Sequence, residues 1–377
     1  MKKEEIAVKK MLSLVICLAM VLSFAVFAVS AEETENDTVI KYLMFASDRH
    51  GDDKVITNIL SNYPYGTQVE YVGLDGDMVD GFTEYDATAV AGEATQIAAN
   101  ATVQIMYGSH DKNAQNADGI LYRESGMLFD GDGYCVYGIT FDGMGSKKGA
   151  ENAAAEADEF KKWVSQIDPS EVIFVLSHKP MHALRGDNQG AIYWHDVLND
   201  AATDDDGNIV RNIIFFHGHN HSEDGTEYLI NAGETLTVAS TDGDVQEQIF
   251  YTYVTAGYLK DNQDATMVVI TDASVTLEKW DASGVCMPMV TITRVRPDPN
   301  WQPPELPTEA ATEAPSETLS EESSETVTEA SEKVPATEPP VTVPVESGNE
   351  PANQSMIGLV VIIATVLVVI CIILKRK

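Results

Sequence analysis

Five short blocks of this chain combine aspartate or histidine with glycine or another turn-forming residue. They contain five of its eight histidines and occupy residues 48–51, 76–80, 108–111, 177–180 and 218–221. Each block lies at or just after the end of an apolar run, where a strand would give way to a loop. Histidine and carboxylate ligands on such loops can hold a catalytic metal. The blocks therefore indicate a metal-dependent hydrolase.

The elements that must position these blocks can be predicted from the spacing of apolar residues. Strands are expected at residues 39–46, 68–74, 103–107, 171–176 and 213–216. Helices are expected at residues 53–60, 85–99, 153–166 and 193–201. The alternating run 134–141 predicts an edge strand or a hairpin arm, and strands with turns are expected beyond Leu236. Apolar strands that alternate with helices imply sheets covered on both faces, with ligand sites where loops leave the strands.

In their order along the chain, the blocks resemble those of the calcineurin-like metallophosphoesterases. That family's pattern is Asp-x-His, Gly-Asp-x-x-Asp, Gly-Asn-His followed by an acid, a single His after a strand, and Gly-His-x-His. The match runs from about residue 40 to residue 221. A single block such as Asp-x-His is common by chance, so the ordered set carries the resemblance. It implies an α/β fold, a four-layer metallophosphoesterase sandwich with two mixed β-sheets packed face to face and flanking helices.

The resemblance also implies a centre for two divalent transition metal ions. The ligand positions correspond to Asp48, His50 and His221 for one ion, His178 and His219 for the other, and Asp77 as a bridge. This mixed set suits Mn, Fe, Zn, Co or Ni better than Mg or Ca. Two such ions can clamp a phosphoryl group and lower the pKa of a shared water. The purple acid phosphatase subgroup has tyrosine where this chain has Asp80, which argues against a tyrosinate-coloured iron site.

The third block supplies the candidate catalytic residues. The resemblance assigns to His110 the stabilisation of phosphoryl oxygens or the protonation of the leaving group, and Asp111 could orient its ring. Ser109 stands where the family usually has asparagine. It is either a direct ligand or a group that reaches the second ion through water, in which case that ion binds more weakly. Asp80 is either a support for a ligand or an ordinary acid at a helix start.

Three residues outside the core of the motifs are candidates for substrate binding. His182 lies on the loop that begins with His178, and His195 could face the mouth of the site. Arg185 offers a planar guanidinium that suits phosphate. Each of the three is alternatively an ordinary surface residue. His217, which ends its strand, is expected to be a structural histidine.

The two ends of the chain predict an exported protein held in a membrane. Residues 1–31 have the pattern of a signal peptide, although an uncleaved anchor has a similar pattern. The predicted metallophosphoesterase domain occupies residues 32–301, and a disordered stalk rich in Pro, Thr, Ser and Glu follows at 302–355. Residues 356–374 predict a transmembrane helix, and residues 375–377 a basic cytoplasmic tail. The protein would then cross the cell membrane once, with an extracellular catalytic domain.

Charge and cysteine content limit the partners. A net charge of −35 argues against binding to nucleic acid or to anionic membrane surfaces. Contact with the membrane is therefore expected through the C-terminal helix. Cys135 and Cys286 fall inside the predicted domain, where they either form a disulfide, as an exported protein allows, or remain free.

Together these features predict a cell-surface metal-dependent phosphoesterase. It would hydrolyse phosphomonoester or phosphodiester bonds with a dimetal-activated hydroxide. The alternative is a catalytically weak or inactive domain of the same fold that serves as a surface binding module, an adhesin or a receptor. Ser109 in place of asparagine and the long stalk motivate this alternative. Hydrolysis of a simple aryl phosphate ester would distinguish the two.

Overall fold

The computed structural model describes residues 39–304, except residues 146–148, 185, 187, 221–227, 261 and 297. The chain divides into two compact units, Met1–Thr308 and Glu309–Lys377, and all described residues belong to the first unit. The predicted signal peptide, transmembrane helix and cytoplasmic tail, and the stalk from residue 305 onward, lie outside the described residues. Among the described helices, none combines the length and the apolar character that crossing a bilayer requires.

Seven strands form the first sheet, in the order β17-β16-β15-β1-β2-β4-β6. Its parallel half consists of β1 (Val39–Ala46), β2 (Val69–Leu74), β4 (Thr102–Met106) and β6 (Leu121–Tyr122). Its antiparallel half consists of β15 (Asp264–Thr271), β16 (Ser274–Asp281) and β17 (Cys286–Thr293). Because β1, β2 and β4 are parallel, the loops that follow them leave the sheet at the same edge.

Six strands form the second sheet, in the order β11-β14-β10-β9-β8-β7. Its four central strands are parallel: β8 (Tyr134–Ile139), β9 (Val172–Ser177), β10 (Ile213–His217) and β14 (Thr252–Thr255). Its edge strands, β7 (Gly126–Asp130) and β11 (Leu229–Ile230), are antiparallel to their neighbours. Both sheets are therefore mixed, as predicted.

Strand β8 decides between the two alternatives that the sequence left open. It is the arm of a hairpin with β7, as expected, but it is not an edge strand, because β9 pairs with its other side. Its alternating sequence does not separate a buried face from a solvent face. Tyr137 packs in the core under the helices, Tyr134 packs in the core between the sheets, and the whole strand is buried. Cys135 on β8 and Cys286 on β17 are free thiols, so they do not form the disulfide that the sequence left open.

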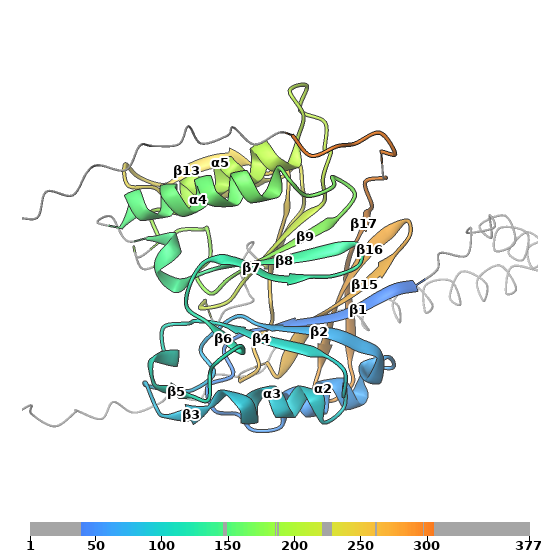
Figure 1. The fold of residues 1–377 in the computed structure, drawn as a ribbon. Helices are drawn as coiled ribbons and strands as arrows, with labels where there is room; N and C mark the ends of the chain where they lie inside the picture. Colours follow the sequence, from blue (N-terminus) through green and yellow to red (C-terminus); the bar gives the residue numbers. More distant parts are fainter. Residues whose placement is uncertain are drawn as a thin grey trace, which may run out of the picture. The chain divides into compact units, whose positions relative to one another are not determined.

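The two sheets pack face to face through an aromatic core. Phe45 of β1 stacks on Phe216 of β10 with ring centroids 4.3 Å apart, and Phe174 of β9 lies 5.2 Å from Phe45. Helices cover the outer faces (Figure 1): α2 (Val55–Asn62) and α3 (Ala87–Thr95) on the first sheet, α4 (Ala150–Val164) and α5 (Ala191–Ala202) on the second. The predicted four-layer α/β sandwich is confirmed.

The helices form where apolar residues recur on one face. Helix α2 buries four apolar side chains between Val55 and Leu60 against the first sheet. Helix α3 begins at Ala87 rather than at residue 85 because the Asp86 side chain caps it by accepting the Thr88 N–H. The remaining elements are short: β3 (Tyr85–Asp86) with β5 (Ala114–Gln115), β12 (Thr235–Val238) with β13 (Val245–Gln248), and 3-10 helices η1 (Gly66–Gln68), η2 (Asp111–Asn113) and η3 (Phe141–Met144).

Candidate metal centre

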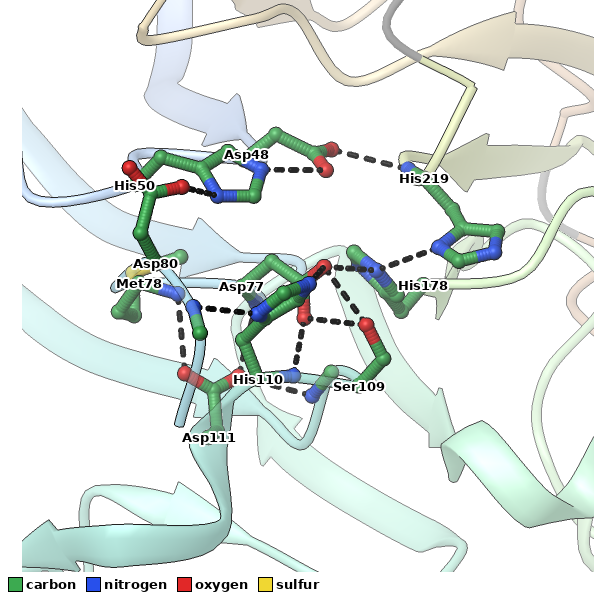
Figure 2. Close-up of polar contacts among 12 residues, drawn as sticks. Asp48, His50, Asp77, Met78, Asp80, Ser109, His110, Asp111, His178 and His219 are labelled. Carbon is green, nitrogen blue, oxygen red and sulfur yellow. Dashed lines mark hydrogen bonds and ion pairs between the residues drawn. The ribbon is translucent and has the colours of Figure 1, made fainter. Parts of the chain in front are cut away.

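Loops from both sheets bring the predicted ligands together at one place (Figure 2). Two of these loops leave the first sheet and two leave the second: Asp48 and His50 follow β1, Asp77 follows β2, His178 follows β9, and His219 follows β10. None of these five residues is more than 8% exposed. The sixth predicted ligand, His221, lies outside the described residues.

These side chains form two groups that share one carboxylate. Asp48, His50 and Asp77 form the first group, and Asp77, His178 and His219 form the second. Within each group, one ligand atom per residue lies within 4.8 Å of the others. Imidazole and carboxylate ligands in this number fit divalent transition metal ions. Among the described residues, each group could therefore hold a divalent metal ion, and Asp77 is a member of both groups.

Hydrogen bonds determine which ring nitrogen of each histidine is directed at the centre. His178 Nδ1 lies 2.5 Å from the Asp75 carbonyl oxygen, so Nδ1 carries a proton and Nε2, 3.1 Å from Asp77 Oδ2, is the ligand atom. His50 Nδ1 lies 2.7 Å from Asp80 Oδ1, which leaves Nε2 on the side of the centre. A carbonyl or carboxylate behind the imidazole is the common support of a ligand histidine. Asp80 has this position relative to His50.

Charge coupling in the second group favours a cation. Burial would lower the pKa of His178, but the nearby carboxylates of Asp77 and Asp48 outweigh it and raise the pKa to about 10. Burial would raise the pKa of Asp77, but the charge and hydrogen bond of His178 lower it to about 2. A bound metal ion would take the place of the His178 proton as the positive partner of this carboxylate.

Four of the predicted ligands have a left-handed backbone conformation. The φ angles are +53° at Asp48, +48° at His50, +56° at Asp77 and +66° at His219. Few residues other than glycine adopt this region, although aspartate and histidine enter it more readily than most. Backbone strain of this kind gathers at functional sites, where the surrounding structure holds it. Here the surrounding support directs four ligand side chains toward one point.

Two glycines of the blocks allow the ligand loops to approach each other. At Gly108, an added Cβ would lie 2.5 Å from Asp77 Oδ1. At Gly218, an added Cβ would lie 2.6 Å from Asp48 Oδ2 and would overlap Ser47 Oγ. Any side chain at either position would displace a ligand carboxylate. The glycines are therefore required by the packing of the loops around the centre.

Ser109 and His110 both contact the shared carboxylate. Ser109 Oγ donates to Asp77 Oδ2 at 2.9 Å, and the His110 backbone N–H donates to Asp77 Oδ1 at 2.7 Å. The Gly81 N–H donates to His110 Nδ1 at 2.8 Å. Because Nδ1 accepts, the proton of the neutral ring is on Nε2, which lies 3.8 Å from Asp77 Oδ2. The His110 ring therefore presents a donor toward the centre.

Contrary to the expectation from the sequence, Asp111 does not orient the His110 ring. Its carboxylate instead accepts the backbone N–H groups of Asp77, Met78 and Gly108 at 2.8 to 2.9 Å (Figure 2). These donors belong to two tight loops and would otherwise be buried without partners, which is costly. The Asp111 carboxylate therefore pairs with these backbone N–H groups and not with the His110 ring. Asp111 thus joins the loop after β2 to the loop after β4.

The three predicted substrate-binding residues have different positions. His195 lies in α5, is 2% exposed, and its Nδ1 is 3.1 Å from the Tyr251 hydroxyl, so it belongs to the helix layer and not to the mouth of the site. Burial also lowers its pKa. His182 is buried, with Nε2 3.2 Å from Asn220 Nδ2, and it supports the loop after β10. Arg185 lies outside the described residues.

Sequence reasoning missed two residues that support the centre. Arg49 is 4% exposed and donates to the Met78 carbonyl and to the Glu93 carboxylate. Tyr85 donates to Asp111 at 3.0 Å. The one sequence feature that pointed to Arg49 is its position, as a charged residue, between the predicted ligands Asp48 and His50. Tyr85 had none, because it lies before a helix and carries no motif.

Comparisons with known proteins find similar structures but no matching sequence family. No family model matches the chain, and no curated protein does. One similar structure is a conserved uncharacterised protein, described as a predicted phosphoesterase, from Streptococcus pneumoniae. It is 12% identical, covers 67% of this chain and 98% of that chain, and has a TM-score of 0.33.

Two other similar structures come from eukaryotes. A purple acid phosphatase from yellow lupin (Lupinus luteus) seeds is 11% identical over 67% of this chain and 54% of that chain, with a TM-score of 0.40. Vacuolar Protein Sorting 29 from Cryptosporidium parvum is 12% identical over 68% of this chain and 100% of that chain, with a TM-score of 0.36. These scores are low, so the resemblance to calcineurin-like metallophosphoesterases stands on this chain's own four-layer fold and converging blocks.

Proposed function

We propose that the chain is a metal-dependent phosphoesterase that hydrolyses phosphomonoester or phosphodiester bonds. The observation that carries this proposal is that two buried ligand groups share the Asp77 carboxylate. A pair of ions held close together is the arrangement used for in-line displacement at phosphorus. Mn, Fe, Zn, Co and Ni ions all suit the mixture of imidazole and carboxylate.

In this proposal the side chains of the centre have separate roles. Two divalent ions, when bound, would polarise the phosphoryl group and lower the pKa of water. Asp77 would lie between the ions, and the other ligands would hold one ion each. His110 would donate from Nε2 to a phosphoryl oxygen or to the leaving oxygen, because the Gly81 N–H already occupies Nδ1. Asp111 would hold the loops that aim Asp77 and His110.

The test is hydrolysis by the purified full-length chain in mild detergent. It would be supplied in turn with each of the five metals and assayed on an aryl phosphate monoester and an aryl phosphate diester. We expect hydrolysis that depends on added metal and that disappears in Asp77→Asn. Asp242→Asn, an exposed acid on the β12–β13 turn, is the matched control and should retain activity. Metal binding without hydrolysis of either ester would favour the surface binding module.

We also propose that the enzyme acts at the cell surface. This rests on the apolar runs at residues 1–31 and 356–374 and on the basic residues after the second run. Protease added to intact cells should degrade the domain while a tag at the C-terminus stays protected. If the domain is protected in intact cells, the location is wrong, but the phosphoesterase proposal is unaffected.

A further inference from the structure

Phe82 is an exposed aromatic residue beside the metal centre, in a conformation that phenylalanine seldom adopts. It is 52% exposed, and its φ angle is +61°. Gly81 before it has a φ of +58°, so two successive residues are left-handed. Glycine, asparagine or aspartate would occupy such a turn with less strain. An aromatic ring that is neither buried nor suited to its backbone conformation calls for a functional explanation.

Hydrogen bonds hold the Phe82 turn against the catalytic loop. The Thr83 N–H and hydroxyl both donate to the Asp80 carbonyl, at 3.1 and 2.6 Å, and close the turn. The Asn113 side chain donates to the Phe82 carbonyl at 2.6 Å. The Gly81 N–H donates to His110 Nδ1 at 2.8 Å. These bonds hold the backbone from which the Phe82 side chain projects.

The Phe82 ring lies against the residue proposed to protonate the leaving group. Its centroid is 5.5 Å from that of His110 with an interplanar angle of 22°, which is a stacked arrangement. In the described part of the chain, His110 is the one ring that Phe82 contacts. About half of the Phe82 side chain remains open to solvent beside His110.

A second aromatic residue at the centre shows what a purely supporting ring looks like. Phe141 lies 5.9 Å from the His178 ring and 5.7 Å from the His219 ring. Lys179 Nζ lies over its face, 3.9 Å from the centroid. Phe141 thus packs on ligand residues and is covered by a cation. Phe82 has no such covering among the described residues and is 52% exposed.

We propose that Phe82 determines specificity by packing against an aromatic ring in the leaving group of the phosphate ester. The ester would carry a planar aryl or heteroaryl group close to the scissile bond. This inference rests on the proposed phosphoesterase function. Packing of two aromatic rings changes an equilibrium by about 2- to 10-fold. The preference for an aromatic over an alkyl leaving group should depend on Phe82 by that factor.

The test compares Phe82→Leu and Phe82→Tyr with the wild type, each as the metal-loaded full-length chain. The substrates are phenyl phosphate, a nucleoside 5′-monophosphate and glycerol phosphate. In Phe82→Leu, the ratio of kcat/KM for phenyl phosphate to that for glycerol phosphate should fall about 2- to 10-fold, and Phe82→Tyr should keep the wild-type ratio. A parallel fall with the nucleotide would show that its base reaches the ring. Tyr65→Leu is the matched control, because Tyr65 is also an exposed aromatic residue, with 43% exposure. It lies in the segment before β2 and stacks on Tyr42.

Binding of phenylphosphonate and methylphosphonate, measured by calorimetry, separates this inference from the proposed function. If the wild type hydrolyses no ester, the proposed function fails. The role of Phe82 in binding an aromatic group would still hold if Phe82→Leu weakened phenylphosphonate binding more than methylphosphonate binding, although its role in ester specificity would fail. Phe82→Leu could instead lower kcat/KM equally for all three esters and alter the pH profile of kcat/KM. In that case the Phe82 ring only supports His110, and the inference is overturned. An unchanged ratio of kcat/KM overturns it as well.

Discussion

The two sides of the metal centre are held in different ways. On the side of the first sheet, the Asp111 carboxylate accepts three backbone N–H groups and fixes the turn that carries Asp77. On the side of the second sheet, aromatic rings also pack behind the ligand loops. His217 stacks on Tyr253 with centroids 4.5 Å apart, and the Tyr253 hydroxyl accepts the Met181 N–H at 2.9 Å. His217 is thus the structural residue that its position at a strand end predicted.

This difference follows from what each side contributes. The first sheet supplies Asp77, on which both ligand groups depend, and several hydrogen bonds to one carboxylate define its turn narrowly. The second sheet supplies His178 and His219, and both residues belong only to the second group. Ring packing is less directional than a charged hydrogen bond. Substitutions on the first-sheet side should therefore have the larger effects, and the following experiments test that expectation.

Asp77→Asn should have the largest effect. The amide keeps the size of the side chain but loses the charge and one of the two acceptor oxygens that the ligand groups share. Since removing a group that merely supports a ligand already costs 10- to 100-fold in activity, we expect kcat/KM to fall by at least about 100-fold. Elemental analysis should give fewer than two metal ions per chain. Full activity with two ions bound would show that Asp77 is not the bridge.

Asp111→Asn and Tyr253→Phe compare the two sides directly. The first substitution would present an amide NH₂ group to backbone donors, and we expect the free energy of unfolding to fall by about 3 kcal/mol. Tyr253→Phe removes the hydroxyl that lies within hydrogen-bond distance of both the Met181 N–H and His182 Nδ1, and it should cost about 1 to 2 kcal/mol. Urea unfolding of the metal-free proteins measures both values. Equal losses would contradict the proposed difference between the two sides.

Metal affinity should increase with pH. The pKa of His178 is raised to about 10 in the metal-free site, so near neutral pH this residue holds a proton that a metal ion must displace. The same proton stabilises the metal-free fold, fully below the usual histidine pKa and less as pH rises toward 10. Between pH 7 and 9 the dissociation constant should therefore fall by up to about tenfold per pH unit. Calorimetry in buffers of different ionisation enthalpy should detect the released proton, and its absence would exclude this coupling.

Ser109→Asn should have the smallest effect, and in the opposite direction. Ser109 Oγ donates to Asp77 at the position where the metallophosphoesterase motif that these blocks resemble has an asparagine. An asparagine would add a carbonyl ligand to the second group and should tighten binding of the second ion by a few-fold, roughly 3- to 10-fold. Metal titration followed by calorimetry measures this, with Ser109→Ala as the control. If the asparagine and alanine variants behave alike, position 109 does not contribute to the second ion.

The failed predictions concern the partners of residues rather than the elements that carry them. Asp111 lies next to His110 in the sequence, but its carboxylate accepts hydrogen bonds from backbone N–H groups of another loop. His195 was correctly placed on a helix, but the face that it occupies packs under Tyr251. For strand β8 the sequence left an edge strand and a hairpin arm open, and its pairing with β9, which comes from a distant segment, excludes the edge strand. In each case the deciding contact is far away in sequence.

Residue types and their spacing along the chain were enough to determine the strands, the helices and the ordered blocks at their ends, because periodicity and strand breaks are local properties. They also determined that imidazole and carboxylate would lie on loops. The family resemblance already implied that Asp77 is the bridge, but only the tertiary structure decided that the two ligand groups lie close enough to share it, that four ligands take left-handed backbones, and that Phe82 lies open beside His110. These features depend on how loops that are far apart in the sequence meet in space, and the distances between such loops are not encoded in the spacing within any one strand or loop.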